Sequence, residues 1–359
     1  MIKNALISLF SFGLVVCANA RTPMPPAASV AETAPAPIID LSPAPFERAE
    51  FVRDTAARFN LDPAMIEATL NRAQFRDSIV SAMSRPAEQV KPWYEYRPIF
   101  ITQARIDGGR LFLSRHRAKL ERVQRETGVP AEVIVSIIGV ETSYGANTGR
   151  YPVLDALYTL AFRYPRSGDP AKLEREIRRE RFFRDELAQL FALANEEKLD
   201  IHQLTGSYAG AMGMGQFMPS SYRQFAVDGD GDGRRDLFGN LDDVFASIAN
   251  YFLKKGGWAP GQPVVARADL MPGYQEFNPD DWQPTYTMMD LAVRGYYLIE
   301  TAPASITATP ISLEGRNGKQ YWFGFQNYYA ITRYNNSKMY AMAVHQLSQA
   351  IAGQAIPPA

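Results

Sequence analysis

The sequence predicts a mainly helical protein of the α+β class, with a small β region towards its C-terminal end. Helical stretches with recognisable starts and stops follow one another from residue 46 to residue 255. Strand-like runs then replace them, and Asn317-Gly318 between two such runs is a strong signal for a β-hairpin. A chain of 359 residues is long enough to bury a large core and to form two or three parts.

Residues 1–20 are typical of a secretory signal. Lys3 supplies the positive charge, residues 5–16 form an apolar run, and Ala18-Asn19-Ala20 matches a cleavage site. The run is too short to cross a bilayer comfortably, so we expect it to be removed. Cys17 leaves a lipid anchor open as an alternative, which the bulky residues just before it disfavour.

After a Pro- and Ala-rich tether over 21–45, most of the predicted helices carry a signal of their own. Asp62 caps the second helix, Gly128 ends a long one, and Gly256-Gly257 closes another. Residues 92–100, PWYEYRPIF, are expected to be irregular and to line a surface or groove. Helical segments are predicted over 46–59, 63–70, 79–83, 102–127, 155–164, 173–195, 242–255 and 337–351.

The densest charge lies in residues 173–195, where acidic and basic side chains recur at helical spacing. This spacing is typical of a solvated face, so we expect no function there. Residues 290–300 and 310–325 are expected to form strands or turns. The sequence shows no internal repeat and no mid-chain apolar run that would span a membrane.

The composition excludes several classes of function. Lys plus Arg and Asp plus Glu number 38 each, so there is no electrostatic case for nucleic acid or an anionic membrane surface. Three histidines and one cysteine leave almost nothing from which to build a zinc, haem or thiol site. We therefore expect no organic cofactor.

The chain is organised around residues 134–145, IVSIIGVETSYG. Pro130 suits the first turn of a helix that is apolar most of the way round, so this helix is predicted to be buried. Glu141 lies at its C-terminal end, where apolar neighbours and the helix dipole both disfavour a charged carboxylate. Both effects predict a raised pKa, as a carboxyl general acid working near neutral pH requires. The alternative is a structural glutamate that is paired with an arginine or wet by solvent.

Residues 206–222, GSYAGAMGMGQFMPSSY, form a glycine-rich segment. Glycine lets the backbone approach a neighbour or a ligand closely. The segment is either a tight crossing inside the protein or the wall of a saccharide groove, where Ser207 and Gln216 would hydrogen-bond to hydroxyl and acetamido groups. A phosphate-binding loop is disfavoured because no Lys-Ser or Lys-Thr pair follows the glycines.

Residues 228–239, DGDGDGRRDLFG, match a calcium-binding loop. Aspartates occupy its first, third and fifth positions, and Gly233 stands at the sharp turn. Gly239 replaces the usual closing glutamate, so a later aspartate is expected to close the cage. We predict a structural Ca²⁺ that holds the adjacent groove in shape, with a solvated acidic turn as the alternative. The expected ligands are Asp228, Asp230, Asp232, the carbonyl of Arg234, and Asp243.

These motifs closely resemble the lytic murein transglycosylase B family from residue 46 to the C-terminus. They are GVETSYG, GSYAGAMGMGQFMPSSY, DGDGDGRRDL, SIANYF and YWFGFQNYYAITRYNNSKMYAMAVHQL. The resemblance implies a lysozyme-like, mainly helical core with an EF-hand-type calcium loop, a flanking helical domain and a small β domain. The implied boundaries are 46–100 and 155–200 for the flanking helices, 101–154, 201–265 and 326–359 for the core, and 266–325 for the β domain.

The resemblance also implies a function. This is cleavage of the β-1,4 bond between N-acetylmuramic acid and N-acetylglucosamine in periplasmic peptidoglycan, leaving a 1,6-anhydromuramoyl end. Glu141 matches the family's single catalytic acid/base. Peptidoglycan strands are the implied partner, with cell-wall synthases or other murein hydrolases as further candidates. The residues that match glycan-contacting positions are Tyr96, Ser207, Gln216, Tyr251, Tyr334, Asn335 and Tyr340.

A single nominated carboxylate agrees with this chemistry, because most glycosidases need two. In a transglycosylase the substrate supplies the second nucleophile through its own C6 hydroxyl. Two alternatives stay open: a hydrolytic muramidase on the same scaffold, and a catalytically silent peptidoglycan-binding module. The sequence does not decide between action at glycan ends and in chain middles, or between peptide stems.

Overall fold

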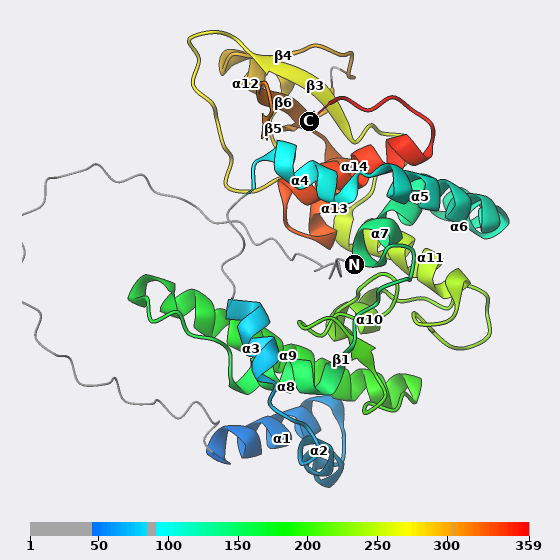
Figure 1. Ribbon diagram of the computed structural model, residues 1–359, viewed down its shortest axis with the longest axis vertical. Coiled ribbons are helices and arrows are strands. Elements are labelled where there is room, and N and C mark those ends of the chain that lie inside the picture. The colour runs from blue at the N-terminus through cyan, green and yellow to red at the C-terminus, as the bar shows by residue number, and fades with distance from the viewer. Residues whose placement is uncertain (1–44, 85–90, 304, 359) are drawn as a thin grey trace, which may run out of the picture.

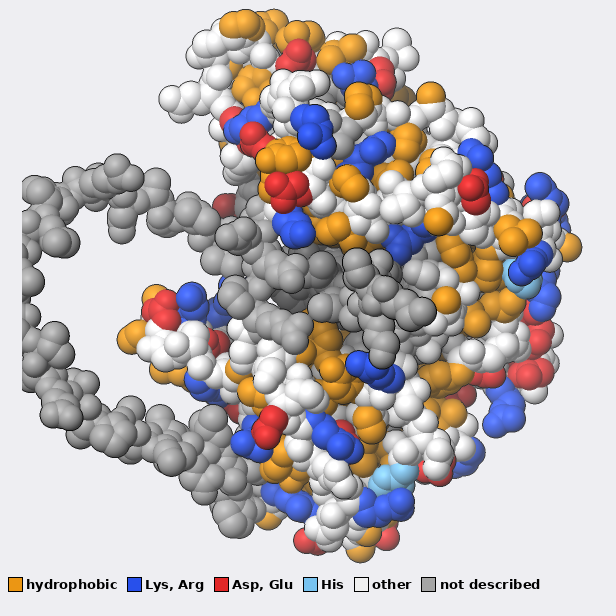
Figure 2. All heavy atoms as spheres, viewed as in Figure 1, with side chains coloured by type: hydrophobic (Ala, Val, Ile, Leu, Met, Phe, Trp, Pro, Cys, Tyr) orange, Lys and Arg blue, Asp and Glu red, His pale blue; other side chains and the backbone are white. Residues whose placement is uncertain are grey.

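The computed structural model describes residues 45–84, 91–303 and 305–358. The predicted secretory signal, Cys17 and nearly all of the tether lie outside these residues. Figure 1 shows a helical lobe at one end, a four-stranded sheet at the other, and a group of helices between them. On the face shown in Figure 2, basic and acidic side chains are interspersed, in keeping with the balanced charge of the sequence.

The helical lobe joins two stretches that are far apart in sequence. It consists of α1 (Pro45–Phe59), α2 (Pro63–Leu70), α3 (Asp77–Ser84), α8 (Val153–Phe162) and α9 (Pro170–Glu197). Phe51 packs edge-to-face against Phe162, with ring centroids 5.7 Å apart. The buried carboxylate of Asp155 accepts hydrogen bonds from the backbone N–H of Gln74 at 2.9 Å and from Nε of Arg76 at 2.8 Å. These contacts hold α8 against the N-terminal helices.

Helix α9 corrects the prediction of a solvated face. Its first half does carry exposed charges, such as the i,i+4 pair of Glu174 and Arg178. Its second half is largely buried from Phe183 onwards and includes the buried Glu186. The prediction is wrong there because α9 packs against both α8 and α10 (Pro219–Phe225), and dense charge in the sequence masks that apolar stripe.

The central helices surround α7 (Ala131–Thr142), which packs against α5, α6, α11 and α14. Every residue of α7 except Glu132 and Glu141 is buried, so the predicted burial is confirmed. Gly128 ends the preceding helix with a left-handed φ of 71°, also as predicted. The other central helices are α4 (Trp93–Phe100), α5 (Gln103–Arg115), α6 (Arg117–Thr127), α11 (Leu241–Tyr251), α13 (Gln326–Tyr334) and α14 (Lys338–Ile351).

Residues 92–100 are almost entirely helical, and the expectation of an irregular segment is wrong. Trp93, Tyr96 and Phe100 recur at helical spacing, so one face of α4 is buried, and the helix packs against α14. Pro98 lies inside this short helix, and proline disfavours a helix interior, so the sequence does not indicate a helix here.

Two predicted helices are each divided in the structure. The segment 102–127 forms α5 and α6, which meet at His116, where φ is −113°. The segment 242–255 forms α11 and a π-helical turn, η1 (Phe252–Gly256), ended by Gly257 with φ 66°. Over the described residues, no helix combines the length and the apolar character that a bilayer crossing needs.

The β region is an antiparallel sheet of order β4-β3-β6-β5. The predicted hairpin is confirmed, but its turn is Arg316-Asn317, because Gly315 pairs with Gly318. Part of the segment 290–300 is helical, since Thr287 and Asp290 form a capping box that starts α12 (Met288–Val293). The strands are β3 (Val265–Leu270), β4 (Tyr296–Leu298), β5 (Thr309–Gly315) and β6 (Gly318–Gly324).

Candidate active site

Glu141 is half-buried in the last turn of α7, at the point where that buried helix ends. The hydroxyl of Tyr340, in the first turn of α14, donates a hydrogen bond to Oε1 of Glu141 at 2.6 Å. Tyr340 is only 2% exposed, so this donor is held in one place by packing. The structure therefore presents one carboxylate, oriented by a buried phenol, at the edge of the core.

The chain turns sharply after Glu141. Ser143, Tyr144 and Gly145 all have positive φ, at 50°, 64° and 85°. The ring of Tyr144 folds back over α7, and its hydroxyl donates to the carbonyl of Arg105 at 2.7 Å. A β-carbon at Gly139 would lie 2.7 Å from that hydroxyl, so only glycine leaves room for the ring. This turn fixes the direction in which the chain leaves the Glu141 position.

An aromatic group lies beside this carboxylate. The rings of Tyr251 and Tyr334 are 4.9 Å apart, and Phe217 is 5.6 Å from Tyr251 and 5.9 Å from Tyr334. Burial, with the nearby charge of Glu141, raises the pKa of Tyr334 and of Tyr340 well above the usual range. Burial raises the pKa of Tyr251 to about 12. These hydroxyls are therefore neutral hydrogen-bonding groups at physiological pH.

Two hydroxyls of this group already have protein partners. Tyr251 donates to the carbonyl of Arg333 at 2.8 Å, and Tyr334 donates to the carbonyl of Gly215 at 2.5 Å. Two of the sequence-predicted groove residues thus bond to backbone carbonyls and connect α11 and α13 to their neighbours.

The glycine-rich segment forms a compact, largely buried loop between β2 (Thr205–Gly206) and α10. Ser207 Oγ accepts from the backbone N–H of Ala211 at 3.1 Å. Nε2 of Gln216 donates to the carbonyls of Thr148 and Gly213, both at 3.0 Å. Both side chains stabilise the loop itself, as expected of a tight interior crossing, and each keeps further hydrogen-bonding capacity.

Close backbone approach explains the glycines. A β-carbon at Gly149 would lie 2.1 Å from the carbonyl of Gly206, and one at Gly213 would lie 2.5 Å from the carbonyl of Leu237. Thr142, next to Glu141, donates to the carbonyl of Met214 at 3.1 Å. The loop is therefore fastened directly to the end of α7.

The remaining predicted groove residues are Tyr96 on α4 and Asn335 at the end of α13. Tyr96 is 4% exposed and packs between Trp93 and Phe100 on α4. Its phenol contributes to the raised pKa of Tyr340. Asn335 ends α13 in an extended conformation and is half-buried. The structure thus brings Tyr334 and Tyr340 next to Glu141 from α13 and α14, while Tyr96 lies beside Tyr340 and Asn335 directly follows Tyr334.

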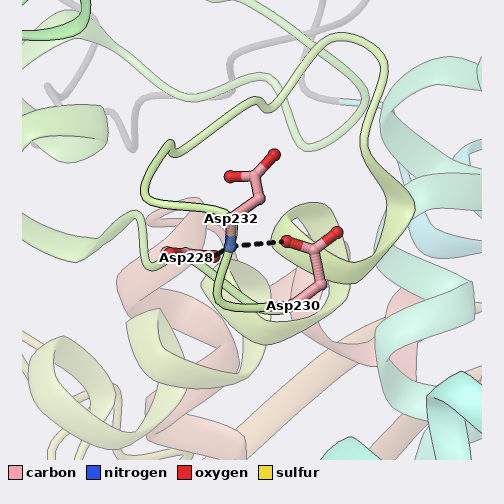
Figure 3. A group of neighbouring side chains, drawn as sticks. All are labelled: Asp228, Asp230 and Asp232. Carbon is pink, nitrogen blue, oxygen red and sulfur yellow. Dashed lines mark hydrogen bonds between the residues drawn. The ribbon is translucent and has the colours of Figure 1, made fainter.

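The carboxylates of Asp228, Asp230 and Asp232 gather on one exposed loop, with ligand atoms within 4.8 Å of one another. Figure 3 shows the three side chains and the hydrogen bond from the N–H of Asp232 to Asp230. The N–H of Gly233 donates to Asp228 at 2.7 Å, and such backbone bonds lower the pKa of Asp228. The cluster offers hard oxygen donors, which Ca²⁺ prefers.

Asp243 is fully buried at the start of α11, outside that three-residue cluster. Its two oxygens accept from the N–H groups of Gly229 at 2.7 Å and Asp236 at 2.6 Å, so it clamps both ends of the loop. Burial raises the pKa of Asp243, and these two hydrogen bonds oppose the rise. Arg234 follows the cluster, and its own N–H donates to Asp232 at 2.8 Å.

Sequence reasoning missed several residues of the site. Phe217 and Tyr144 lie inside motifs that were recognised in the sequence, and this position could have marked them as candidates. Arg105 gave no such signal: it is buried, and its guanidinium donates to the carbonyl of Ile99 at 2.8 Å and to Ser143 Oγ at 3.3 Å. Burial of a charged side chain is decided by packing and cannot be read from its position in the chain.

One surface cavity, of about 290 Å³, lies between α1 and α9 and is lined by charged residues such as Glu50, Arg58 and Arg181. Another, of about 130 Å³, lies on the sheet beside Trp322. Neither is lined by a residue of α7. The candidate active site is thus defined by its carboxylate and hydrogen bonds rather than by either of these cavities.

Comparison with known proteins agrees with this geometry. Residues 46–349 match the model of the transglycosylase SLT domain. The chain is 38% identical over 312 residues to membrane-bound lytic murein transglycosylase B of Escherichia coli (strain K12), covering 84% of this chain and 82% of that protein. The chain therefore belongs to the transglycosylase SLT domain family. Its enzymatic class is that of the lytic murein transglycosylases.

Solved structures share the fold. Soluble lytic transglycosylase SltB1 from Pseudomonas aeruginosa is 43% identical, with a TM-score of 0.75 over 86% of this chain and 98% of that one. Escherichia coli Slt35, solved in complex with calcium, is 38% identical with a TM-score of 0.72, over 85% of this chain and 92% of that one. SltB3 from Pseudomonas aeruginosa, in complex with NAG-anhNAM-pentapeptide, is 28% identical with a TM-score of 0.71, over 86% and 79%. The lysozyme-like, mainly helical fold class predicted from the sequence is confirmed.

Proposed function

We propose that this enzyme cleaves the β-1,4 bond between N-acetylmuramic acid and N-acetylglucosamine in peptidoglycan, with Glu141 as its single acid/base. The observation that carries the proposal is the half-buried Glu141 carboxyl at the end of α7, held by the hydroxyl of Tyr340 at 2.6 Å. The complex of the relative SltB3 with NAG-anhNAM-pentapeptide supports the substrate and the anhydro product.

In this mechanism the protonated Glu141 gives its proton to the glycosidic oxygen as the bond to C1 breaks. The acetamido group of the muramoyl residue stabilises the positive charge that develops at C1. Glu141, now a carboxylate, takes the proton of the C6 hydroxyl of the same sugar, and that oxygen bonds to C1. The 1,6-anhydro ring closes, the proton is returned to Glu141, and no water is consumed.

The surrounding residues are proposed to bind the glycan. Ser207 and Asn335 would orient the acetamido group, and Gln216 would contact the sugar from the loop that it stabilises. The aromatic residues suit stacking on sugar rings, because an aromatic ring combines an apolar face with, in tyrosine, a hydroxyl. This glycan-binding set is Tyr96, Tyr251, Tyr334 and Tyr340 together with those three polar residues.

We also propose that the aspartate loop holds a structural Ca²⁺, as a calcium complex of the relative Slt35 suggests. Asp228, Asp230 and Asp232 fit a hard cation, because their exposed carboxylates converge. The carbonyl of Arg234 would add a ligand, and each oxygen of Asp243 keeps a second lone pair beyond its backbone bond. When bound, the ion would neutralise the cluster and rigidify the segment that leads into α11.

The signal over residues 1–20 supports a periplasmic site of action, where peptidoglycan lies. The relative from Escherichia coli is named as membrane-bound, so attachment through Cys17 is the alternative to simple cleavage. Mass spectrometry of the mature protein separates a free N-terminus after Ala20 from an acylated Cys17.

The mass of the fragments that the enzyme releases from purified peptidoglycan tests the proposed reaction. An anhydro product is lighter by one water than the product of hydrolysis, so mass spectrometry of the soluble fragments distinguishes a transglycosylase from a hydrolytic muramidase. Hydrated muramoyl ends would contradict the mechanism. Binding to sacculi without any released fragment would point to a catalytically silent module.

A further inference from the structure

A second buried carboxyl, that of Glu186 on α9, has no part in the mechanism above. Glu186 is 2% exposed. Its Oε2 accepts from the backbone N–H of Ser220 at 2.9 Å, and its Oε1 accepts from Ser220 Oγ at 2.6 Å. Both bonds reach the first turn of α10, so a residue of the helical lobe is fastened to the helix that follows the glycine-rich loop.

The residue that Glu186 holds comes directly after the glycine-rich loop. Phe217 is tied to Met212 by two backbone hydrogen bonds of 2.9 Å, and its ring packs on Tyr251 and Tyr334. Only Met218 and Pro219 separate Phe217 from Ser220. The middle of the loop is fastened to α7 through Thr142 and Met214, and Glu186 fastens its C-terminal end. The loop that carries Gln216 is therefore held at points on either side of this residue.

The charges around Glu186 leave it largely unneutralised. Burial raises the pKa of Glu186 to about 7, against the two bonds from Ser220; Asp185 adds to the rise, and Arg179 opposes it. Tyr251 on α11 faces it as well, since the charge of Glu186 contributes to the raised pKa of that tyrosine. Glu186 therefore changes charge near neutral pH.

Several other ionisable groups on the helices packed around α9 have partners of their own. On α10, Arg223 pairs with Glu196; on α8, Asp155 pairs with Arg76 and Tyr158 stacks on Phe75; on α1, Arg58 pairs with Asp185 and Glu47 with Arg184.

We propose that Glu186 is a positioning residue for the transglycosylase reaction, which holds the glycine-rich loop in register with Glu141 through its two hydrogen bonds to Ser220. The proposal rests on the proposed function. As a neutral acid, Glu186 accepts the N–H of Ser220 on one oxygen and shares a proton with its hydroxyl on the other. When it ionises, its two hydrogen bonds to Ser220 favour the charge, but burial disfavours the charge more strongly. Opening of the clamp to water therefore becomes easier, and the loop loosens. Glycan binding weakens as a result, whereas proton transfer at Glu141 is not touched.

The test compares the wild-type enzyme with Glu186→Gln and with Glu174→Gln, the same change at an exposed position on the same helix. The amide introduced by Glu186→Gln can keep both hydrogen bonds to Ser220 and cannot ionise. We expect the KM of the wild type and of the Glu174 variant for soluble peptidoglycan fragments to rise about threefold or more from about pH 6 to about pH 8. The KM of the Glu186 variant should stay flat, with kcat following one common pH curve in all three. A KM of Glu186→Gln that rises in parallel with the wild type overturns the proposal.

A second variant tests what happens when one hydrogen bond of the clamp is removed. Ser220→Ala removes the hydroxyl bond and leaves the backbone N–H, so the fold should persist, as circular dichroism will show. We expect its KM to be raised about threefold at all pH values, with kcat unchanged. An unchanged KM in Ser220→Ala overturns the clamp. The mass of the wild-type product, measured in the same assay, tests the anhydro-forming reaction separately. Failure of the proposed reaction can therefore be distinguished from failure of the proposed clamp.

Discussion

At the scale of single residues, the site depends on a carboxyl group whose environment comes from a different part of the chain. Glu141 stands at residue 141 and its hydrogen-bond donor at residue 340, and the two meet because α7 packs against α14. Burial of nearly the whole of α7 leaves Glu141 as the polar end of an apolar helix. Three predictions belong to this scale.

Replacing Glu141 with Gln should abolish the proton transfer and leave the fold intact. The amide oxygen can still accept from Tyr340, while the side chain can no longer give a proton to the glycosidic oxygen. We expect a loss of about 10²-fold or more in kcat. Release of anhydro fragments from sacculi measures it, with an unchanged melting temperature as the control. A variant with near wild-type turnover would refute the role of Glu141.

Replacing Tyr340 with Phe should lower kcat by about tenfold, because Glu141 loses the donor that orients it. The ring stays packed, so stability should fall by about 1 kcal/mol only. Tyr296→Phe is the matched control, since Tyr296 is also 2% exposed but lies in the sheet region. Equal activity of the two variants would show that the hydroxyl of Tyr340 does not matter for catalysis.

Glu186 should make the free energy of unfolding depend on pH. Its folded pKa of about 7 lies above the ordinary glutamate value of 4.5, so the folded state binds more protons between these values. Stability is then highest below the unfolded pKa and falls as the pH rises towards 7, by about 3 kcal/mol at most. Urea unfolding of wild type and Glu186→Gln at acidic and mildly alkaline pH measures this. Parallel pH dependences in the two proteins would contradict it.

At the scale of elements, the sequence predicted where helices begin and end better than it predicted which helix faces are buried. Asp62 caps α2 through the N–H of Ala64 at 2.9 Å, and Ser337 caps α14, as their side chains suggest. Caps are decided within one turn, and so they can be read from neighbouring residues. Helix α4 and the buried half of α9 were misjudged, because their conformation or burial depends on partners distant in sequence.

The aspartate loop is the element for which a bound ion should matter most. Removing Ca²⁺ with a chelator should lower the melting temperature, because a ligand at about 100 times its Kd stabilises the folded state by about 2.7 kcal/mol. Differential scanning calorimetry with and without chelator measures the shift. Asp230→Asn should melt alike in both conditions. Identical melts of the wild-type protein after exhaustive metal removal would count against the site.

At the scale of the whole molecule, a few polar contacts hold the helical lobe together and fasten it to α10. Asp155, 5% exposed, bonds to the N–H of Gln74 and to Arg76, and so unites α8 with the α2–α3 connection. The lobe in turn holds α10 through Glu186. The domain boundaries taken from the family resemblance stay predictions.

Asp155→Ala should destabilise this lobe, because the charged hydrogen bonds of a buried carboxylate with Gln74 and Arg76 are lost, at a cost of about 2–3 kcal/mol. Denaturant unfolding measures the loss, and limited proteolysis should show earlier cleavage within α1–α3. Asp77→Asn is the control, since Asp77 has a 90% exposed side chain and only a 3.9 Å contact with Arg163. Equal stability of the two variants would show that these contacts are not needed.

The sequence by itself determined the fold class, the identity of the candidate carboxylate, the hairpin and the aspartate loop. Each of these is written in contiguous residues: an apolar helix ending in Glu141, a turn signal near Asn317, and alternating aspartates from Asp228. Only the tertiary structure decided which groups meet, such as Tyr340 with Glu141 and Ser220 with Glu186. The physical reason is that caps, turns and ion-binding loops are local, whereas burial and the charge state of a buried acid depend on packing between distant segments.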